Sequence, residues 1–298
     1  MDWQEQLITI YVYVCKHYEN NLWVYCQRMS NYSNLEFSDE EVITLYLFGI
    51  IDKNTEIKRI YAYVDRHLRD WFPKLPSYVA FVQRLNRVAD AFSPLLEIIQ
   101  LEAEQSRIGG TSSLLIDSFP VSLAKQGHRF KACVAKELAD SGYCSTKKLY
   151  FYGVRVHVIG RREAGTLPSP EYIGVTPASY NDGKVFDQIS PEIFNEEIFG
   201  DKAYQRPNAN EIEEKQGVTV LTPVKKKKGQ KYLEADQMWL SKAVSTVRQP
   251  IETLFGWIEE KTNIEFAGKV RSYSGLLVHV FGRLAAAMFF WNKLRVCS

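Results

Sequence analysis

A change of hydrophobic period near residue 110 constrains the fold of this chain more than any other feature. Apolar residues recur at helical spacing up to about residue 106, as they do from Ile57 to Leu68. The paired Gly109 and Gly110 then interrupt the pattern. Short apolar runs bounded by turns follow, which is typical of strands. We therefore expect a helical domain at 1–106, a linker at 107–112 and a second domain at 113–298.

Composition excludes several protein classes. The 298 residues are 46% hydrophobic, which excludes disordered and fibrous chains because a folded core needs that apolar surface. The net charge of +2 is too small to identify a partner, so any nucleic-acid site must come from local clusters. The five cysteines form no C-x-x-C pair, which argues against a zinc module and against a disulfide framework.

The composition also predicts a cytoplasmic location without membrane association. The N-terminal residues are acidic where a secretory signal would be basic. The most apolar stretch, Leu276 to Trp291, is interrupted by His279 and Arg283 and is shorter than a membrane span. We interpret this stretch as a buried core helix.

The second domain is expected to be α/β, so that the whole chain is α+β with two domains. Three strands come first, and later strands alternate with helices, which is typical of a mixed sheet. The region from Leu149 to Ile159 alternates clearly, with Arg155 and His157 on the face opposite the valines. The five predicted strands are Ser113–Val121, Leu149–Ile159, Tyr172–Thr176, Glu197–Gly200 and Thr219–Val224.

Three carboxylates fall at informative places in this pattern. Asp117 lies within an apolar strand, where a carboxylate is costly to bury unless it is paired or binds a metal. Asp201 directly follows the fourth strand, at an end where ligand sites collect in α/β sheets. Glu252 lies in the helical region after the fifth strand. Taken singly, each is also consistent with a cap or a solvated ion pair.

Together these positions resemble the layout of RNase H-like polynucleotidyl transferases. The chain is similar to bacterial DDE transposases, most of all to the insertion-sequence nine-eight-two family, over nearly its whole length. The resemblance is carried by Leu75-Pro76-Ser77 to Arg87, Ile116-Asp117-Ser118, Tyr152 to His157, Asn181-Asp182, Gly200-Asp201-Lys202-Ala203-Tyr204, and Arg248 with Glu252.

The resemblance implies a DNA transposase whose catalytic and metal-binding residues are Asp117, Asp201 and Glu252. Such carboxylates suit two Mg²⁺ ions, for which Mn²⁺ substitutes, one activating the nucleophile and one stabilising the leaving oxygen. The implied reaction cuts the ends of a mobile element and joins the freed 3′-OH to target DNA. Two alternatives stay open, namely a metal-dependent nuclease that does not join strands and a non-catalytic DNA-binding derivative.

The sequence also departs from related transposases around Glu252. Arg248 matches an arginine four residues before the glutamate, but Ser245 and Glu259 stand where a tyrosine and a lysine are usual. In a continuous helix Arg248 would pair with Glu252, so a structural salt bridge competes with a DNA contact. Pro250 leaves the helical register before Glu252 open.

Basic clusters supply the expected contacts to double-stranded DNA. Lys225, Lys226, Lys227 and Lys228 form a run that suits phosphate contacts, although a solvated loop is an equal alternative. Residues 121–155 carry seven basic and two acidic side chains, a net charge of 7 − 2 = +5 directly after the Asp117 strand. This segment favours a DNA-binding surface beside the carboxylates, which we call the DNA track.

The remaining DNA-binding candidates are single side chains. His157 lies on the polar face of its strand and would contact a phosphate, unless it is simply packed or exposed. In the N-terminal domain, Arg84 and Arg87 would face a groove if the helices flanking Pro73 and Pro76 form a helix-turn-helix-like unit. The helical domain is expected to recognise the terminal repeats and to support a homodimer or larger complex on nucleoid DNA.

Overall fold

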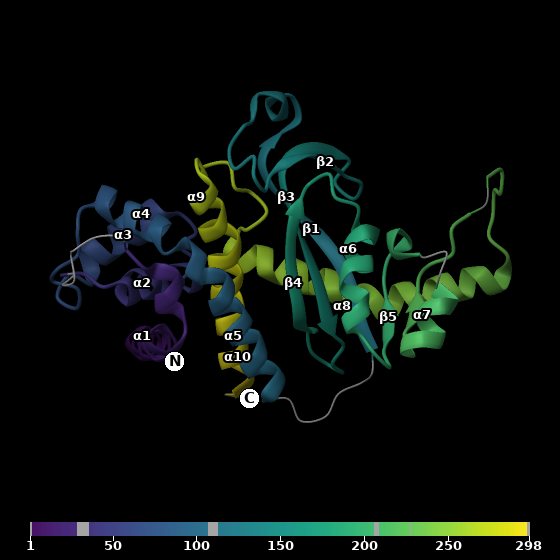
Figure 1. Cartoon of the computed structure of the whole chain (residues 1–298), viewed down its shortest axis with the longest axis horizontal. Coiled ribbons are helices and arrows are strands. Elements are labelled where there is room, and N and C mark those ends of the chain that lie inside the picture. The colour runs from purple at the N-terminus through teal and green to yellow at the C-terminus, as the bar shows by residue number, and fades with distance from the viewer. Residues whose placement is uncertain (1, 29–35, 107–112, 206–208, 227, 297–298) are drawn as a thin grey trace. The chain divides into compact units, whose positions relative to one another are not determined.

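A computed structural model describes residues 2–28, 36–106, 113–205, 209–226 and 228–296 (Figure 1). The chain divides into two compact units. The helical unit comprises Met1–Glu102 together with Ile258–Ser298, and the sheet unit comprises Ala103–Trp257. The predicted second domain, 113–298, therefore differs from the observed unit, because the last 41 residues, 258–298, belong with the N-terminal helices. The predicted linker, 107–112, lies outside the described residues.

The helical unit is built almost entirely from helices. Ser38 begins one of them with a capping box, in which its hydroxyl accepts from the Glu41 amide and the Glu41 carboxylate accepts from the Ser38 amide. The helices are α1 (Trp3–Asn20), α2 (Asp39–Ile51), α3 (Ile57–His67), α4 (Tyr78–Arg87), α5 (Phe92–Gln105), α9 (Tyr273–Leu277) and α10 (Arg283–Val296).

The C-terminal helices join this unit because they are too apolar to face water. Side chains of α2 are buried around its circumference, and α10 packs against it. The Tyr46 hydroxyl donates to the Val278 carbonyl at 3.0 Å, and the Asn292 amide donates to the Ile99 carbonyl at 3.0 Å. The stretch Tyr273–Asn292 is long and apolar enough to span a membrane, but 78% of its apolar window is buried in the protein. This burial confirms the predicted core helix.

The sheet unit contains a mixed sheet of six strands in the order β2-β3-β1-β5-β6, with β4 also paired to β3. Antiparallel pairing joins β1 to β3, whereas β1, β5 and β6 run parallel. This arrangement confirms an α+β chain with an RNase H-like mixed sheet, with one strand, β2, more than predicted. The strands are β1 (Ser113–Lys125), β2 (Asp140–Cys144), β3 (Leu149–Arg161), β4 (Ser169–Pro177), β5 (Glu197–Phe199) and β6 (Thr219–Leu221).

Helices cover both faces of the sheet (Figure 1). Because side chains alternate along a strand, Leu114 and Ile116 of β1 pack against α6 (Asp182–Ile189). Leu115 packs instead against α8 (Ala235–Thr262) through Val244 and Ile251. The shorter α7 (Ala209–Gln216) connects β5 to β6. The alternation along β1 therefore decides which helix each polar side chain of that strand meets.

Candidate active site

Asp117 lies on the face of β1 that is turned toward α8. Its neighbours two residues away share that face, since Leu115 packs against Ile251 and the Phe119 ring lies 4.9 Å from the Phe255 ring. One Asp117 oxygen accepts from the Ser118 amide at 2.8 Å. The other accepts from Arg248 Nη1 of α8 at 2.6 Å. The strand therefore presents this carboxylate, only 19% exposed, directly to the helix that carries Glu252.

Asp201 reaches the same level of the sheet because β5 runs parallel to β1. Leu115 pairs with Phe199, so continuing the register by two residues sets Asp201 beside Asp117. Gly200 makes this approach possible, since a Cβ there would lie 3.0 Å from Ile116. The Asp201 carboxylate caps the following turn by accepting from the Ala203 amide at 2.6 Å.

Glu252 comes from the middle of α8, which continues through Pro250 without losing its register. Arg248 Nη2 donates to Glu252 at 2.5 Å, four residues away, while Nη1 of the same guanidinium holds Asp117. Glu252 is 57% exposed, whereas Arg248 is 17% exposed. The helical salt bridge considered for Arg248 is therefore present, and it also ties the helix to β1.

Negative charge accumulates around Asp117. Burial raises the pKa of Asp117 to about 6; the Arg248 guanidinium opposes the shift, and the charges of Asp201 and Asp182 add to it. One arginine thus offsets several carboxylates in a partly dehydrated site. Such a site favours a further cation or a proton.

The buried hydroxyl of Tyr204 lies close enough to feel the charge of the same carboxylates. Tyr204, 1% exposed, stacks edge-on against Phe186, and its hydroxyl has no hydrogen-bond partner among the described residues. Burial, followed by the charges of Asp182, Asp117 and Asp201, raises the pKa of Tyr204 well above its ordinary value. The hydroxyl therefore stays protonated and available to donate.

The oxygen atoms of Asp117, Asp201 and Glu252 are suitable ligands for a hard divalent cation, but the three carboxylates do not surround a common point. Within the described part of the chain, no three His, Cys, Asp or Glu side chains converge as a metal-holding group. Arg248 instead occupies the place of a cation between Asp117 and Glu252. Oxygen-rich ligands of this kind are those that Mg²⁺ prefers. The residues thus fit a metal once the guanidinium moves away.

A fourth carboxylate, Asp182, belongs to this region and was not predicted as a site residue. It begins α6, accepts from the Ser118 hydroxyl at 2.7 Å, and pairs with Arg155 at 3.1 Å. Ser118 and His157 are opposite residues of β1 and β3, so they share the face turned toward α6. The Asn181-Asp182 motif is the sequence signal that could have indicated Asp182. Asn181 caps α6 and thereby places Asp182 at the first position of that helix.

Comparison with known proteins decides the family. Residues 108–289, more than half of the chain, match the family model described as Transposase DDE domain. The chain belongs to this transposase family. No curated protein and no solved structure matches it. The family match confirms the predicted DDE class and implies DNA as substrate and a divalent metal as cofactor, whereas the closer resemblance to the insertion-sequence nine-eight-two family stays a prediction.

The structure favours the packed alternative for His157 of this transposase over the phosphate contact. His157 is 1% exposed, its Nε2 lies 2.8 Å from the Thr176 hydroxyl, and its Nδ1 lies 3.6 Å from Asp182. Burial lowers the pKa of His157 to about 4, although the Asp182 charge acts in the opposite direction. The alternation along β3 is confirmed, and α6 covers the face that carries His157.

The predicted lysine contacts lie on an exposed loop of the transposase between β6 and α8. Lys225, Lys226 and Lys228 are exposed, and Lys227 lies outside the described residues. The Lys226 ammonium donates to the Lys231 carbonyl at 2.8 Å, which folds the loop back on itself. These lysines remain open to phosphate contacts and are not part of the carboxylate cluster.

Arg84 and Arg87 of α4 differ in their surroundings. The Arg84 guanidinium lies 5.8 Å from the Phe37 ring centre, and its buried Nη2 has no hydrogen-bond partner among the described residues. Burial lowers the pKa of Arg84. Arg84 is thus half-buried, whereas Arg87 is exposed. The contacts of both arginines with DNA stay predictions.

Proposed function

We propose that this transposase cleaves phosphodiester bonds at the ends of a mobile element and joins the freed 3′-OH to target DNA. The proposal rests on the contacts of Arg248 in α8 with Asp117 in β1 and with Glu252. Asp201, two residues after the end of β5, lies at the same height of the sheet as Asp117. Asp117, Asp201 and Glu252 would be the catalytic carboxylates and would hold two Mg²⁺ ions, or Mn²⁺ in their place. The bound ions would supply activation of the nucleophile and stabilisation of the leaving oxygen.

The protein side chains have separate roles in this proposal. The Ser118 amide fixes one Asp117 oxygen, so the carboxylate stays aimed at α8 whether or not it is charged. The Ala203 amide orients Asp201 in the same way. Glu252, the most exposed of the three, is free to turn toward substrate. The buried Tyr204 hydroxyl would donate a hydrogen bond to a ligand oxygen bound among these carboxylates.

Arg248 would exchange partners during the reaction. In the structure it neutralises Asp117 and Glu252, which lowers the repulsion between carboxylates in the absence of a metal. With the carboxylates neutralised by bound cations, the Arg248 guanidinium would be free to bind a DNA phosphate. This exchange accommodates both the observed salt bridge and the predicted DNA contact.

Exposed basic and aromatic side chains next to the sheet suit the DNA track. The guanidinium carbon of Arg129 lies 4.2 Å from the ring centre of Phe130 and 4.4 Å from that of Tyr150. The ring centres of Tyr150 and Tyr143 are 4.7 Å apart. Phe130 is 76% exposed, which is unusual for a phenylalanine without a partner to bind. Phosphate contacts from nearby lysines and stacking on these rings would hold a strand.

The helical unit would recognise the terminal repeats and support a homodimer or larger complex on cytoplasmic, nucleoid-bound DNA. In it, α3 and α4 pack closely, because the Tyr61 ring contacts those of Tyr78 and Phe81. The Tyr61 hydroxyl also donates to the Pro76 carbonyl in the connection between the helices, at 2.9 Å. This rigid helix pair leaves Arg87 exposed on α4 and suits a DNA-recognition unit.

The experiment incubates the full chain and Mg²⁺ or Mn²⁺ with labelled duplexes from the DNA that flanks the gene. Cleavage at a defined end that leaves a 3′-OH, followed by joining to target DNA, is the expected result. The Asp117→Asn variant must lose both steps. Cleavage without joining would identify a nuclease instead. Binding without cleavage in either metal would identify a non-catalytic DNA-binding derivative.

A further inference from the structure

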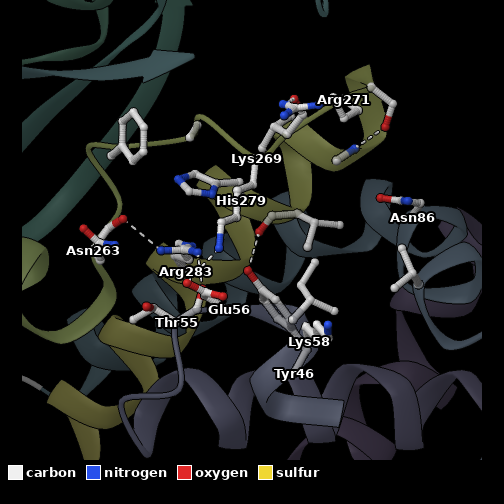
Figure 2. A pocket seen from close by; sticks show the side chains of 18 of the residues that line it. Tyr46, Thr55, Glu56, Lys58, Asn86, Asn263, Lys269, Arg271, His279 and Arg283 are labelled. Carbon is white, nitrogen blue, oxygen red and sulfur yellow. Dashed lines mark hydrogen bonds and ion pairs between the residues drawn. The ribbon is translucent and has the colours of Figure 1, made fainter. Parts of the chain in front are cut away.

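The helical unit contains a pocket of about 490 Å³ that the proposed chemistry does not use (Figure 2). Its walls come from residues 55–58 at the start of α3, from α4, and from residues 263–283. The volume lies within the range of sites for small molecules and single nucleotides. Four cationic side chains, Lys58, Lys269, Arg271 and Arg283, line the pocket together with one carboxylate, Glu56.

Arg283 is the most informative wall residue. It is 8% exposed, and its guanidinium donates to the Asn263 carbonyl at 2.9 Å, the Thr55 carbonyl at 2.5 Å and the Thr262 carbonyl. Its Nε has no hydrogen-bond partner, and no carboxylate of the described residues lies within ion-pair distance. Arg283 also hydrogen-bonds to Tyr46, so all its partners are neutral groups. A buried charge held by neutral groups alone is costly, and an anion entering the pocket would offset that cost.

The N-terminus of α3 adds to the positive potential in the pocket. Glu56 is the N-cap of this helix, but its side chain makes no capping hydrogen bond. Its carboxylate instead pairs with Lys269 at 2.8 Å, as Figure 2 shows. The first-turn N–H groups of α3 thus receive no cap from the Glu56 side chain, and they carry the positive end of the helix dipole. This arrangement is an independent feature that favours an anion.

The one carboxylate does not cancel the cations. Lys58 has no ion pair in the described part of the chain, and Arg271 donates only to the Gly268 and Val270 carbonyls, each at 2.7 Å. His279 adds no charge, because burial, and then the Arg283 charge, lowers the pKa of His279 to about 3. Its Nε2 lies 2.8 Å from the Ile264 carbonyl, so that nitrogen carries the proton. The pocket is therefore net positive.

The local backbone explains how an apolar segment presents these groups. Val278–Gly282 forms a π-helical turn, and Arg283 directly follows it at the start of α10. Such turns displace side chains from the regular helical face and occur often at functional sites. Asn263, with a φ of 50°, turns the chain after α8 so that its carbonyl reaches Arg283. His279 and Arg283, which interrupt the apolar C-terminal segment, thus line the pocket.

We propose that this pocket binds the phosphate group of a nucleotide. The cations and the N-terminus of α3 supply the phosphate site, and neutral walls flank it: Tyr78 and Phe266 offer aromatic faces, and Asn86 offers an amide for a base edge. Tyr78 is 38% exposed and Phe266 50% exposed, so both remain accessible. The nucleotide is either free or one unit of a DNA strand.

The test compares two double variants of the full chain that lose the same charge. Lys58→Gln with Arg271→Gln changes the pocket, whereas Arg59→Gln with Arg66→Gln changes exposed residues of α3 that do not line it. Arg283 is left intact, because it holds three backbone carbonyls and its loss would also disturb folding. Calorimetry measures the binding of deoxyadenosine monophosphate, inorganic phosphate, deoxyadenosine and a short DNA duplex.

The expected result is that the monophosphate binds more tightly than deoxyadenosine, and that the pocket variant weakens it by about tenfold. The control variant should stay within about twofold of the wild type. If only the duplex binds, and the pocket variant alone weakens it, the phosphate belongs to a DNA strand. Equal binding by both variants, or no binding of any phosphate probe, would overturn the proposal. Asp117→Asn protein should bind like the wild type, so this test is independent of cleavage.

Discussion

Two arginines with little exposure show how the two units of this chain differ. Arg248 of the sheet unit bridges Asp117 and Glu252, so its charge is fully compensated and the carboxylates around it stay in excess. Arg283 of the helical unit donates to backbone carbonyls and hydrogen-bonds to Tyr46, and no carboxylate of the described residues pairs with it. The first site lacks positive charge and the second lacks negative charge. The partners of an arginine therefore indicate which sign of ligand each site requires.

The largest expected effect concerns the sheet unit. Asp201→Asn should lower metal-dependent cleavage by at least about 10³-fold while DNA binding is retained, because it removes a carboxylate at the end of β5. Cleavage rates and DNA affinity are measured on the same preparation. Asp236→Asn, an exposed position at the start of α8, is the control. Normal cleavage by Asp201→Asn would remove this residue from the mechanism.

The second prediction separates the two arginines directly. Arg248→Gln should lower the free energy of unfolding of the metal-free protein by about 1–3 kcal/mol, because the buried Asp117 loses its partner. The same variant should bind Mn²⁺ at least as tightly as the wild type, since no guanidinium competes for the carboxylates. Denaturant unfolding and Mn²⁺ titration check both parts, with Arg66→Gln as a control of equal charge. Weaker Mn²⁺ binding by Arg248→Gln would contradict the exchange of partners.

The third prediction uses the pKa of Asp117, which is raised from 3.8 to about 6 in the folded protein. The folded protein holds this proton more tightly than the unfolded chain, so the carboxyl lowers the free energy of unfolding as the pH rises from about 4 to 6. Asparagine does not ionise, so the Asp117→Asn variant does not lose this stability as the pH rises. Without metal, it should be more stable than the wild type by about 1–3 kcal/mol at pH 7.5 and equal to it at pH 4. A stability difference that is the same at both pH values would be evidence against the crowded carboxylates.

The smallest expected effect concerns the loop before α8. Replacing Lys225 to Lys228 by glutamine should weaken DNA binding and flatten its salt dependence by up to about 0.9 in slope per lost phosphate contact. Binding at several salt concentrations measures this slope. An unchanged slope would make the run a solvated loop, and the exposed lysines of 121–155 would then remain as the DNA track.

The sequence predicted the strands that carry Asp117 and Asp201, because alternation and the end of a strand are local properties. It did not predict β2, a short polar strand in which Gly142 lies against the Ala178 backbone, since no apolar pattern marks it. It also left open whether His157 is packed or exposed, because a face covered by a distant helix looks the same as a solvent face. The sequence pattern places residues 258–298 in the second domain, since nothing local shows that α10 packs against α2. The Arg283 pocket depends on the same long-range packing.

A crystal structure of the full chain with Mn²⁺ and a DNA end would test the central claim most directly. Anomalous scattering locates the ions without reference to the protein. The proposed site predicts two Mn²⁺ ions coordinated by oxygens of Asp117, Asp201 and Glu252, with the Arg248 guanidinium moved onto a phosphate. Mn²⁺ bound elsewhere, with the contacts from Arg248 to Asp117 and Glu252 retained, would contradict it.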